Sequence, residues 1–108
     1  MSDATKYDSG KLPLELVPPV IMEEIARVLQ FGVEKYGRDN WRKGMQWTRL
    51  FGAILRHLFA WVRGEDNDKE SGISHLAHAA TSIAFLLEYR VIAKEKDDRL
   101  IGEQIPKI

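Results

Sequence analysis

The chain has 108 residues, 16 basic and 16 acidic side chains, and no cysteine. This length predicts a single compact domain, 1–108, and the lack of thiols excludes disulfides, zinc–thiolate sites and a cysteine nucleophile. The balanced charge argues against a nucleic-acid-binding protein, and no apolar run approaches the ~20 residues that a membrane span needs.

The first 18 residues are expected to form an irregular arm. Pro13, Pro18 and Pro19 interrupt any helix there. The polar opening MSDATKYDSGK lacks the apolar core of a signal peptide, which favours a cytoplasmic protein. Apolar residues between positions 12 and 17 favour an ordered strap that packs on the domain. Alternatively, Lys11 could reach a phosphate of a ligand.

Apolar residues recur at helical spacing in three segments, and we expect helices over 19–36, 48–63 and 74–93. Pro19 suits a first helical turn, Thr48 suits an N-cap, and Gly37 and Gly64 suit helix ends. The fold class is therefore all-α: a small bundle of three main helices followed by a charged tail, 94–108. The third helix is apolar on two sides, so we expect a homo-oligomer to complete the bundle.

The loop between the first two helices, GRDNWRKGMQW, contains two tryptophans among basic residues. Trp41 and Trp47 are expected to anchor this loop to the core. The functional alternative is a platform on which a nucleobase stacks.

The three histidines of the chain fall within 22 residues, at the junction of the second and third expected helices. His75 and His78 are three apart, so they share a helix face. In an antiparallel hairpin that turns near residues 67–68, His57 falls level with His78, and the three imidazoles could converge. Imidazole binds divalent metals and donates hydrogen bonds to phosphate. The competing interpretation is three unrelated histidines.

An acidic turn, GEDND, lies inside this hairpin. Asp66 and Asp68 could offer the oxygen ligands that Mg²⁺ prefers when it also binds phosphates. A solvated turn in which Asp68 or Ser71 caps the next helix is the alternative. The sequence contains no HExxH, no glycine-rich phosphate loop and no GxSxG motif.

Several motifs together resemble the N-terminal domain of phage dATP/dGTP diphosphohydrolases: YDSGK, LVPP, FGVEKYG, NWRKG and LRHLFAWVRGED with its continuation to HLAHA. The resemblance covers about residues 6–90, and the hairpin is also similar to MazG-like all-α nucleotide pyrophosphatases. It implies hydrolysis of the α–β bond of a nucleoside triphosphate by an oligomer. It also implies Mg²⁺ held by paired carboxylates on two neighbouring helices, and the host cytoplasm as the location of a phage protein.

One departure from the MazG-like pattern concerns these carboxylates. The pattern has an acidic Glu-x-x-Asp pair on the last helix, where this chain has His75 and His78. Its acidic segment on the preceding helix falls near Gly52, Ala53 and Arg56. Either the carboxylates come from elsewhere (Glu24, Glu34, Asp66 and Asp68 are available), or the metal-dependent activity is absent.

We expect a hydrolase that converts a purine deoxynucleoside triphosphate to the monophosphate and pyrophosphate with Mg²⁺ or Mn²⁺. Most of such chemistry is positioning and charge neutralisation. Three sets of residues are our candidates: Glu34, Asp66 and Asp68 to hold the metal; Glu34, His57, His75 and His78 for catalysis; and Lys11, Lys35, Arg56, Trp41 and Trp47 to bind the substrate. A non-catalytic protein that binds or sequesters a nucleotide or nucleotide signal is the first alternative, and a helical partner-binding protein without a ligand is the second.

Overall fold

A computed structural model describes residues 3–7 and 9–100, and residues 101–108 of the expected tail lie outside the described part. Three main helices follow one another along the chain: α1 (Pro19–Tyr36), α2 (Trp47–Val62) and α3 (His75–Ile92). Short 3-10 turns, η1 to η3, cover Leu14–Leu16, Asn40–Lys43 and Lys94–Lys96. Within the described residues the pairing of Asn67 with Ser74 is an isolated bridge outside any strand. The all-α prediction is confirmed.

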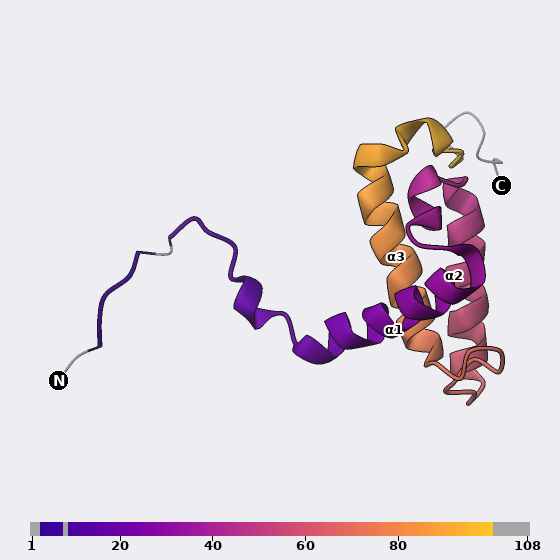
Figure 1. The fold of residues 1–108 in the computed structure, drawn as a ribbon, viewed down its shortest axis with the longest axis horizontal. Coiled ribbons are helices and arrows are strands. Elements are labelled where there is room, and N and C mark those ends of the chain that lie inside the picture. Colours follow the sequence, from indigo (N-terminus) through magenta and orange to yellow (C-terminus); the bar gives the residue numbers. More distant parts are fainter. Residues whose placement is uncertain (1–2, 8, 101–108) are drawn as a thin grey trace, which may run out of the picture.

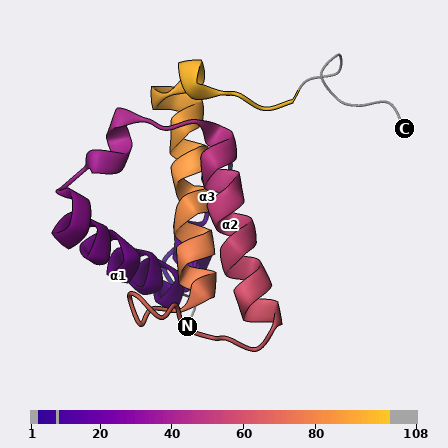
Figure 2. The same cartoon turned by 90° about the vertical axis from the view of Figure 1, so that its right-hand side faces the viewer.

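Helix α3 lies between the other two helices (Figure 2). It packs along α2, and α1 crosses its N-terminal half (Figure 1). Ser74 caps α3, because its side-chain oxygen accepts hydrogen bonds from the amides of Leu76 and Ala77. The α2–α3 connection therefore emerges at the same end of the bundle as the crossing with α1.

The second helix starts one residue earlier than expected, and Thr48 does not cap it. Gln46 is the N-cap residue. The amide and hydroxyl of Thr48 instead donate to the carboxylate of Asp98, at 2.9 and 2.6 Å. A residue that lies 50 positions later thus satisfies an amide of the first turn of α2.

The best-packed part of the core lies at the C-terminal end of α3. Tyr89 is fully buried there with Leu50 and Ala93, and Trp41, Trp47 and other apolar residues pack against them. The Tyr89 hydroxyl donates to the carbonyl of Trp41 at 2.6 Å, and the Trp47 indole N–H donates to the carbonyl of Ala93 at 3.1 Å. Both tryptophans therefore anchor the loop to the core, as the first of the two interpretations predicted.

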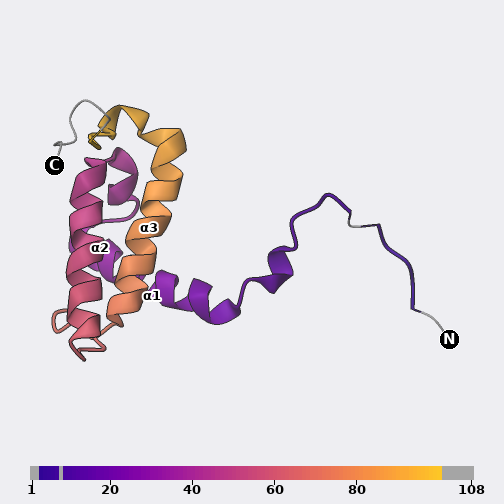
Figure 3. The same ribbon diagram turned by 180° about the vertical axis from the view of Figure 1, so that it is seen from behind.

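The N-terminal arm projects away from the bundle (Figure 3). The chain has a radius of gyration of 18.0 Å, against about 13 Å for a compact domain of this length. The arm exposes Leu12, Leu14 and Leu16 by 73–82%, so it does not form a strap packed on its own domain. In the described part of the chain, no helix is long and apolar enough to cross a membrane.

Candidate functional site

The connection from α2 to α3 is held by its own backbone. Gly64 leaves α2 with a φ of 98°, which favours glycine, and the Glu65 amide then returns to the carbonyl of Ala60. Further on, the Asp68 amide donates to the carbonyl of Ile73 and the His75 amide donates to that of Asp66, at 2.8 and 2.9 Å. These bonds turn the side chains of Glu65 and Asp68 towards the histidines.

The three imidazole rings lie together. The Nδ1 atoms of His57 and His75 are 2.8 Å apart. The ring of His78 stacks on that of His57, with centroids 4.6 Å apart and planes 7° from parallel. The hairpin register therefore brings all three rings into one cluster, with His75 rather than His78 in hydrogen-bonding contact with His57.

Glu65 fixes the orientation of His75. Its Oε2 lies 2.9 Å from His75 Nε2, and His75 is only 4% exposed. An ionised carboxylate can only accept, so Nε2 carries the proton and Nδ1 presents a lone pair to His57. A carboxylate that orients a histidine in this way is the usual support of a metal-binding imidazole.

Asp68 and Ser71 form the other side of the cluster. Asp68 Oδ2 accepts hydrogen bonds from the amide and hydroxyl of Ser71, at 2.9 and 3.1 Å. The same hydroxyl lies 2.7 Å from Nε2 of His78. Asp68, His57 and His75 each offer one ligand atom, and these three atoms lie within 4.8 Å of one another. Asp68 thus completes a cluster that could hold a metal ion, and it does not cap α3.

Burial and neighbouring charges set the protonation of these groups. Burial lowers the pKa of His57, and the nearby His78 and His75 lower it further. Burial also lowers the pKa of His78, although Asp68 opposes this shift. Burial alone would raise the pKa of Asp68, but hydrogen bonds from Ser71 and the nearby His78 and His57 outweigh it and lower that pKa. The lowered pKa values of His57 and His78 favour their neutral imidazoles, and the lowered pKa of Asp68 favours its carboxylate.

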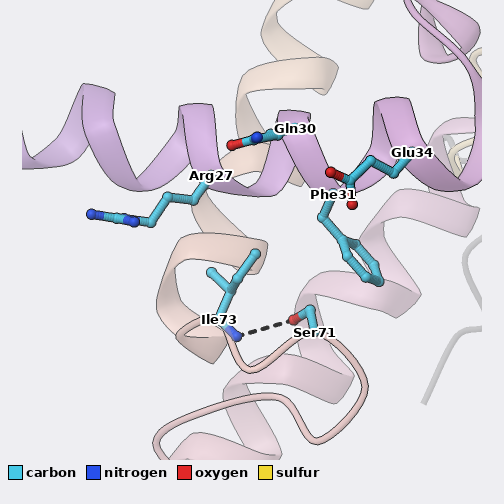
Figure 4. Close-up of a pocket in the computed structure, with 6 residues that line it drawn as sticks. All are labelled: Arg27, Gln30, Phe31, Glu34, Ser71 and Ile73. Atoms are coloured by element: carbon cyan, nitrogen blue, oxygen red, sulfur yellow. Dashed lines mark hydrogen bonds between the residues drawn. The ribbon is translucent and has the colours of Figure 1, made fainter.

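A pocket of about 240 Å³ opens next to the cluster, between α1 and the α2–α3 connection (Figure 4). Ser71 and Ile73 line it from the connection. The ring of Phe31 also meets that of His78 edge-on, with centroids 6.3 Å apart. The residues from α1 are Arg27, Gln30, Phe31 and Glu34. The pocket therefore adjoins the histidines through Ser71 and Phe31 and carries both charge signs.

The structure places the other candidate residues differently. Glu34 lines the pocket, but it is not part of the His57–Asp68–His75 cluster. Asp66 is exposed and also outside that cluster, although its carbonyl holds the His75 amide. Lys35 forms an ion pair with Glu70 of the connection.

The remaining candidate substrate-binding residues lie farther from the cluster or point outward. Arg56 is exposed on α2, next to His57 in the chain, and its guanidinium lies close to Gly52. Lys11 is exposed in the projecting arm. Trp41 stacks on Phe85, with ring centroids 4.3 Å apart. Phe85 lies about two turns of α3 beyond His78, so Trp41 is far from the histidine cluster. Trp47 lies at the same end of α3.

Sequence reasoning did not assign Glu65 as the support of His75, or Arg27 and Gln30 to the pocket. Glu65 and His75 are ten positions apart across a turn, and only the path of the connection shows that they meet. Arg27 and Gln30 fall on the polar face of α1, which looks like an ordinary solvated face until the connection is placed against it.

Comparisons with known proteins identify the family of the chain. The profile of the family described as "dATP/dGTP diphosphohydrolase, N-terminal" matches residues 1–99. The chain belongs to this family. A curated dATP/dGTP diphosphohydrolase from Salmonella phage PMBT28 is 40% identical over 103 residues, which make up 95% of this chain. The chain spans 35% of the length of that relative. No solved structure matches the chain.

The resemblance of the sequence to MazG-like enzymes implies Mg²⁺ as the bound ion. Mg²⁺ takes oxygen ligands, mainly carboxylates, waters and phosphates. The cluster in this chain offers two imidazole nitrogens and one carboxylate oxygen. Such a mixed set fits ions that accept nitrogen, Mn²⁺ among them, better than it fits Mg²⁺.

Proposed function

We propose that this domain provides the catalytic site of a deoxynucleoside triphosphate diphosphohydrolase, with a purine nucleotide, dGTP or dATP, as substrate. The carrying observation is the convergence of His57, Asp68 and His75 beside an open pocket. Family membership supports the class of reaction. The pocket lining is mostly polar and includes Arg27 and Glu34, which suits a charged, phosphate-bearing substrate better than an apolar one.

In this proposal the phosphates lie between the pocket and the histidine cluster. A divalent cation, Mg²⁺ or Mn²⁺, held by His57, Asp68 and His75 would neutralise phosphate charge and acidify water. Arg27 lines the pocket and contributes positive charge to the phosphates. His78 and Ser71 lie side by side and supply polar groups at the boundary between pocket and cluster.

Glu34 is our candidate for the general base. It lines the pocket on α1, opposite Ser71, and its carboxylate can accept a proton. The attacking water then forms a bond to the α-phosphorus and gives its proton to Glu34. The bond from the α-phosphorus to the bridging oxygen breaks, and pyrophosphate leaves with that electron pair.

The direct test is to incubate the chain with dGTP or dATP and Mg²⁺ or Mn²⁺ and to follow the products by phosphorus NMR. We expect the resonances of a nucleoside monophosphate and pyrophosphate. A Glu34→Gln variant should bind the nucleotide but lose turnover, whereas Glu23→Gln, three turns earlier on α1 and outside the set of residues that lines the pocket, should keep its turnover. Absence of turnover with either ion in the natural chain would refute the enzymatic proposal.

A nucleotide-binding or nucleotide-sequestering protein is the second candidate. One feature of the sequence favours it: by the resemblance to MazG-like enzymes, His75 and His78 stand where those enzymes have an acidic pair. The pocket of about 240 Å³ is also smaller than a typical ligand site of ~300–1,000 Å³. Recovery of an intact nucleotide from the denatured protein, together with a nucleotide-dependent rise in melting temperature and no turnover, would support this candidate.

We also propose that the chain forms a homo-oligomer. Its accessible surface is 9103 Å², against about 6100 Å² for a compact monomer of this mass. The excess exceeds the ~1,600 Å² of a standard protein interface. A groove of about 490 Å³ between α2 and α3 is lined largely by apolar side chains, including Phe51, Ile83 and Leu87. The exposed leucines of the arm of a second copy are the proposed occupant.

A further inference from the structure

We propose that the cluster of His57, Asp68 and His75 is a selective site for a nitrogen-binding transition-metal ion, of the Mn²⁺, Co²⁺ and Zn²⁺ class, and that it discriminates against Mg²⁺. The role of the ion rests on the proposed function. The preference itself follows from the donor atoms, their spacing and the groups that hold them.

The donor atoms are the first reason. Imidazole nitrogen binds first-row transition metals well, whereas Mg²⁺ gives up its water ligands reluctantly and selects oxygen. Only Asp68 supplies oxygen here, because the neighbouring Asp66 is outside the cluster. Two imidazoles and one carboxylate on one side of an ion leave its other positions open, which is the arrangement of known transition-metal sites that bind substrate.

The spacing of the nitrogens is the second reason. Two nitrogens that each lie ~2.1 Å from one ion are about 3.0 Å apart at a right angle and about 3.4 Å apart at a tetrahedral angle. The Nδ1 atoms of His57 and His75 are 2.8 Å apart. The rings therefore need to separate by only a few tenths of an ångström to share an ion with right-angled ligands.

The supporting groups are the third reason. Glu65 keeps the proton of His75 on Nε2, which leaves Nδ1 unprotonated and aimed at His57. Ser71 occupies Oδ2 of Asp68 with two hydrogen bonds, so Oδ1 is the oxygen left open to an ion. Asp68 is thus positioned by accepting hydrogen bonds from Ser71, and His75 by donating one to Glu65. The third ligand, His57, is positioned by stacking on His78.

A metal-free explanation of the short contact also exists, and it makes a different prediction. In that case His57 is protonated on Nδ1 and donates to Nδ1 of His75. A simple histidine–histidine hydrogen bond would stabilise the connection without selecting any ion. Measurements of metal binding in the absence of nucleotide separate the two explanations.

The experiment uses the full chain, freed of metal with a chelator and dialysed. Co²⁺, Zn²⁺, Mn²⁺ and Mg²⁺ are titrated separately, with calorimetry for affinity and visible absorption of Co²⁺ as a spectroscopic signature of nitrogen ligands. We expect one Co²⁺ or Zn²⁺ ion per chain, weaker binding of Mn²⁺ and the weakest binding of Mg²⁺, in the general order of metal affinities. The Zn²⁺ affinity should exceed that of Mg²⁺ by at least ~100-fold.

The variants test which residues bind the ion. His57→Gln and Asp68→Asn should each weaken Co²⁺ binding by more than about 100-fold, because the first removes a nitrogen ligand and the second removes the negative charge of the oxygen ligand. Asp66→Asn is the matched control: it removes an exposed carboxylate of the same turn and should leave the affinity unchanged. His57 is only partly buried, so the His57→Gln chain is expected to fold, which its circular dichroism checks.

Three results would overturn the proposal: no binding of Co²⁺ or Zn²⁺, equal affinities for Zn²⁺ and Mg²⁺, or unchanged Co²⁺ binding in both His57→Gln and Asp68→Asn. The outcome is independent of the proposed activity, because no nucleotide is present. A chain that binds Co²⁺ as expected but never cleaves dGTP or dATP would refute the hydrolase and leave the metal site standing.

Discussion

The bond between Glu65 and His75 allows a quantitative prediction about the site. In a Glu65→Ala variant, Nε2 of His75 loses its acceptor while the ring stays 4% exposed. A buried donor left without a partner costs about 1–3 kcal/mol. The Glu65 side chain is itself 35% exposed, so water can enter the space and the lower end, about 1 kcal/mol, is expected. For a domain of this size that lowers Tm by about 4–8 °C.

The same variant should weaken metal binding more than it lowers stability. With Glu65 removed, the proton of His75 is no longer held on Nε2, and the ring is free to rotate. Loss of such a supporting carboxylate typically weakens metal affinity by about 10–100-fold, or about 1.4–2.7 kcal/mol. Calorimetry with Co²⁺ measures this loss, and nitrogen-15 NMR of the imidazole reports the tautomer directly.

Glu65→Gln is the control, because its side-chain oxygen still accepts the hydrogen bond from Nε2. This variant should keep the tautomer and lose only a small part of the metal affinity. If Glu65→Ala, Glu65→Gln and the natural chain have the same tautomer and the same Co²⁺ affinity, Glu65 does not orient His75 and the reasoning fails.

Three other predictions concern the scaffold. Tyr89→Phe removes the donor to the buried carbonyl of Trp41 and should cost about 1–3 kcal/mol in urea unfolding, whereas an unchanged midpoint would contradict the bond. Hydrogen bonds from Thr48 lower the pKa of Asp98. The contribution of the ionised Asp98 to folding stability is therefore fully present above the ordinary pKa of an aspartate, and it is lost as the pH falls through the lowered pKa. The natural chain should therefore lose stability below about pH 4 more steeply than Asp98→Asn; parallel curves would refute this. Leu14→Ser, in the exposed arm, should shift the mass measured by sedimentation towards that of the monomer. A natural chain that is already monomeric would refute the proposed docking of the arm in the groove of a second copy.

Local patterns were enough to predict the three helices, because each has a long apolar periodicity and a recognisable end. The start of α2 was predicted wrongly at Thr48, since the partner of its hydroxyl is Asp98 and no local signal records that pairing. The projecting arm was also missed. Its leucines predicted a strap packed on the domain, but apolar character alone does not indicate whether a segment packs on its own chain or on another copy.

The site was predictable in its location but not in its connections. The spacing of His57, His75 and the acidic turn placed imidazoles and carboxylates at one end of a helical hairpin. The choice between Asp66 and Asp68 depends on backbone hydrogen bonds within the connection, which point one aspartate inward and leave the other exposed. The two tryptophans had two interpretations, and the packing of Trp41 on Phe85 and of Trp47 near Ala93 favours the structural one.

The two imidazoles of the proposed metal site have a consequence for the affinity of the site for phosphates. A divalent ion held by Asp68 and two neutral imidazoles would leave a net charge of about +1 on the ion and its three ligands, whereas an ion surrounded by several carboxylates is neutral or negative. The positive centre should attract a triphosphate more strongly than a monophosphate. We therefore expect the metal-loaded chain to bind dGTP more tightly than dGMP, with an affinity for dGTP that falls as ionic strength rises.

Calorimetry of the Co²⁺-loaded chain with dGTP and dGMP at two salt concentrations tests this expectation. If the natural chain cleaves dGTP, the same titration is made in the Glu34→Gln variant, which should bind the nucleotide without turnover. Asp68→Asn provides a sharp comparison, because it removes the one ligand charge while the amide oxygen remains. If this variant still holds the ion at saturating concentration, its centre is more positive and should bind dGTP at least as tightly as the natural chain. Weaker dGTP binding by the ion-loaded variant would show that Asp68 does more than balance charge, and that the phosphates do not lie against the ion.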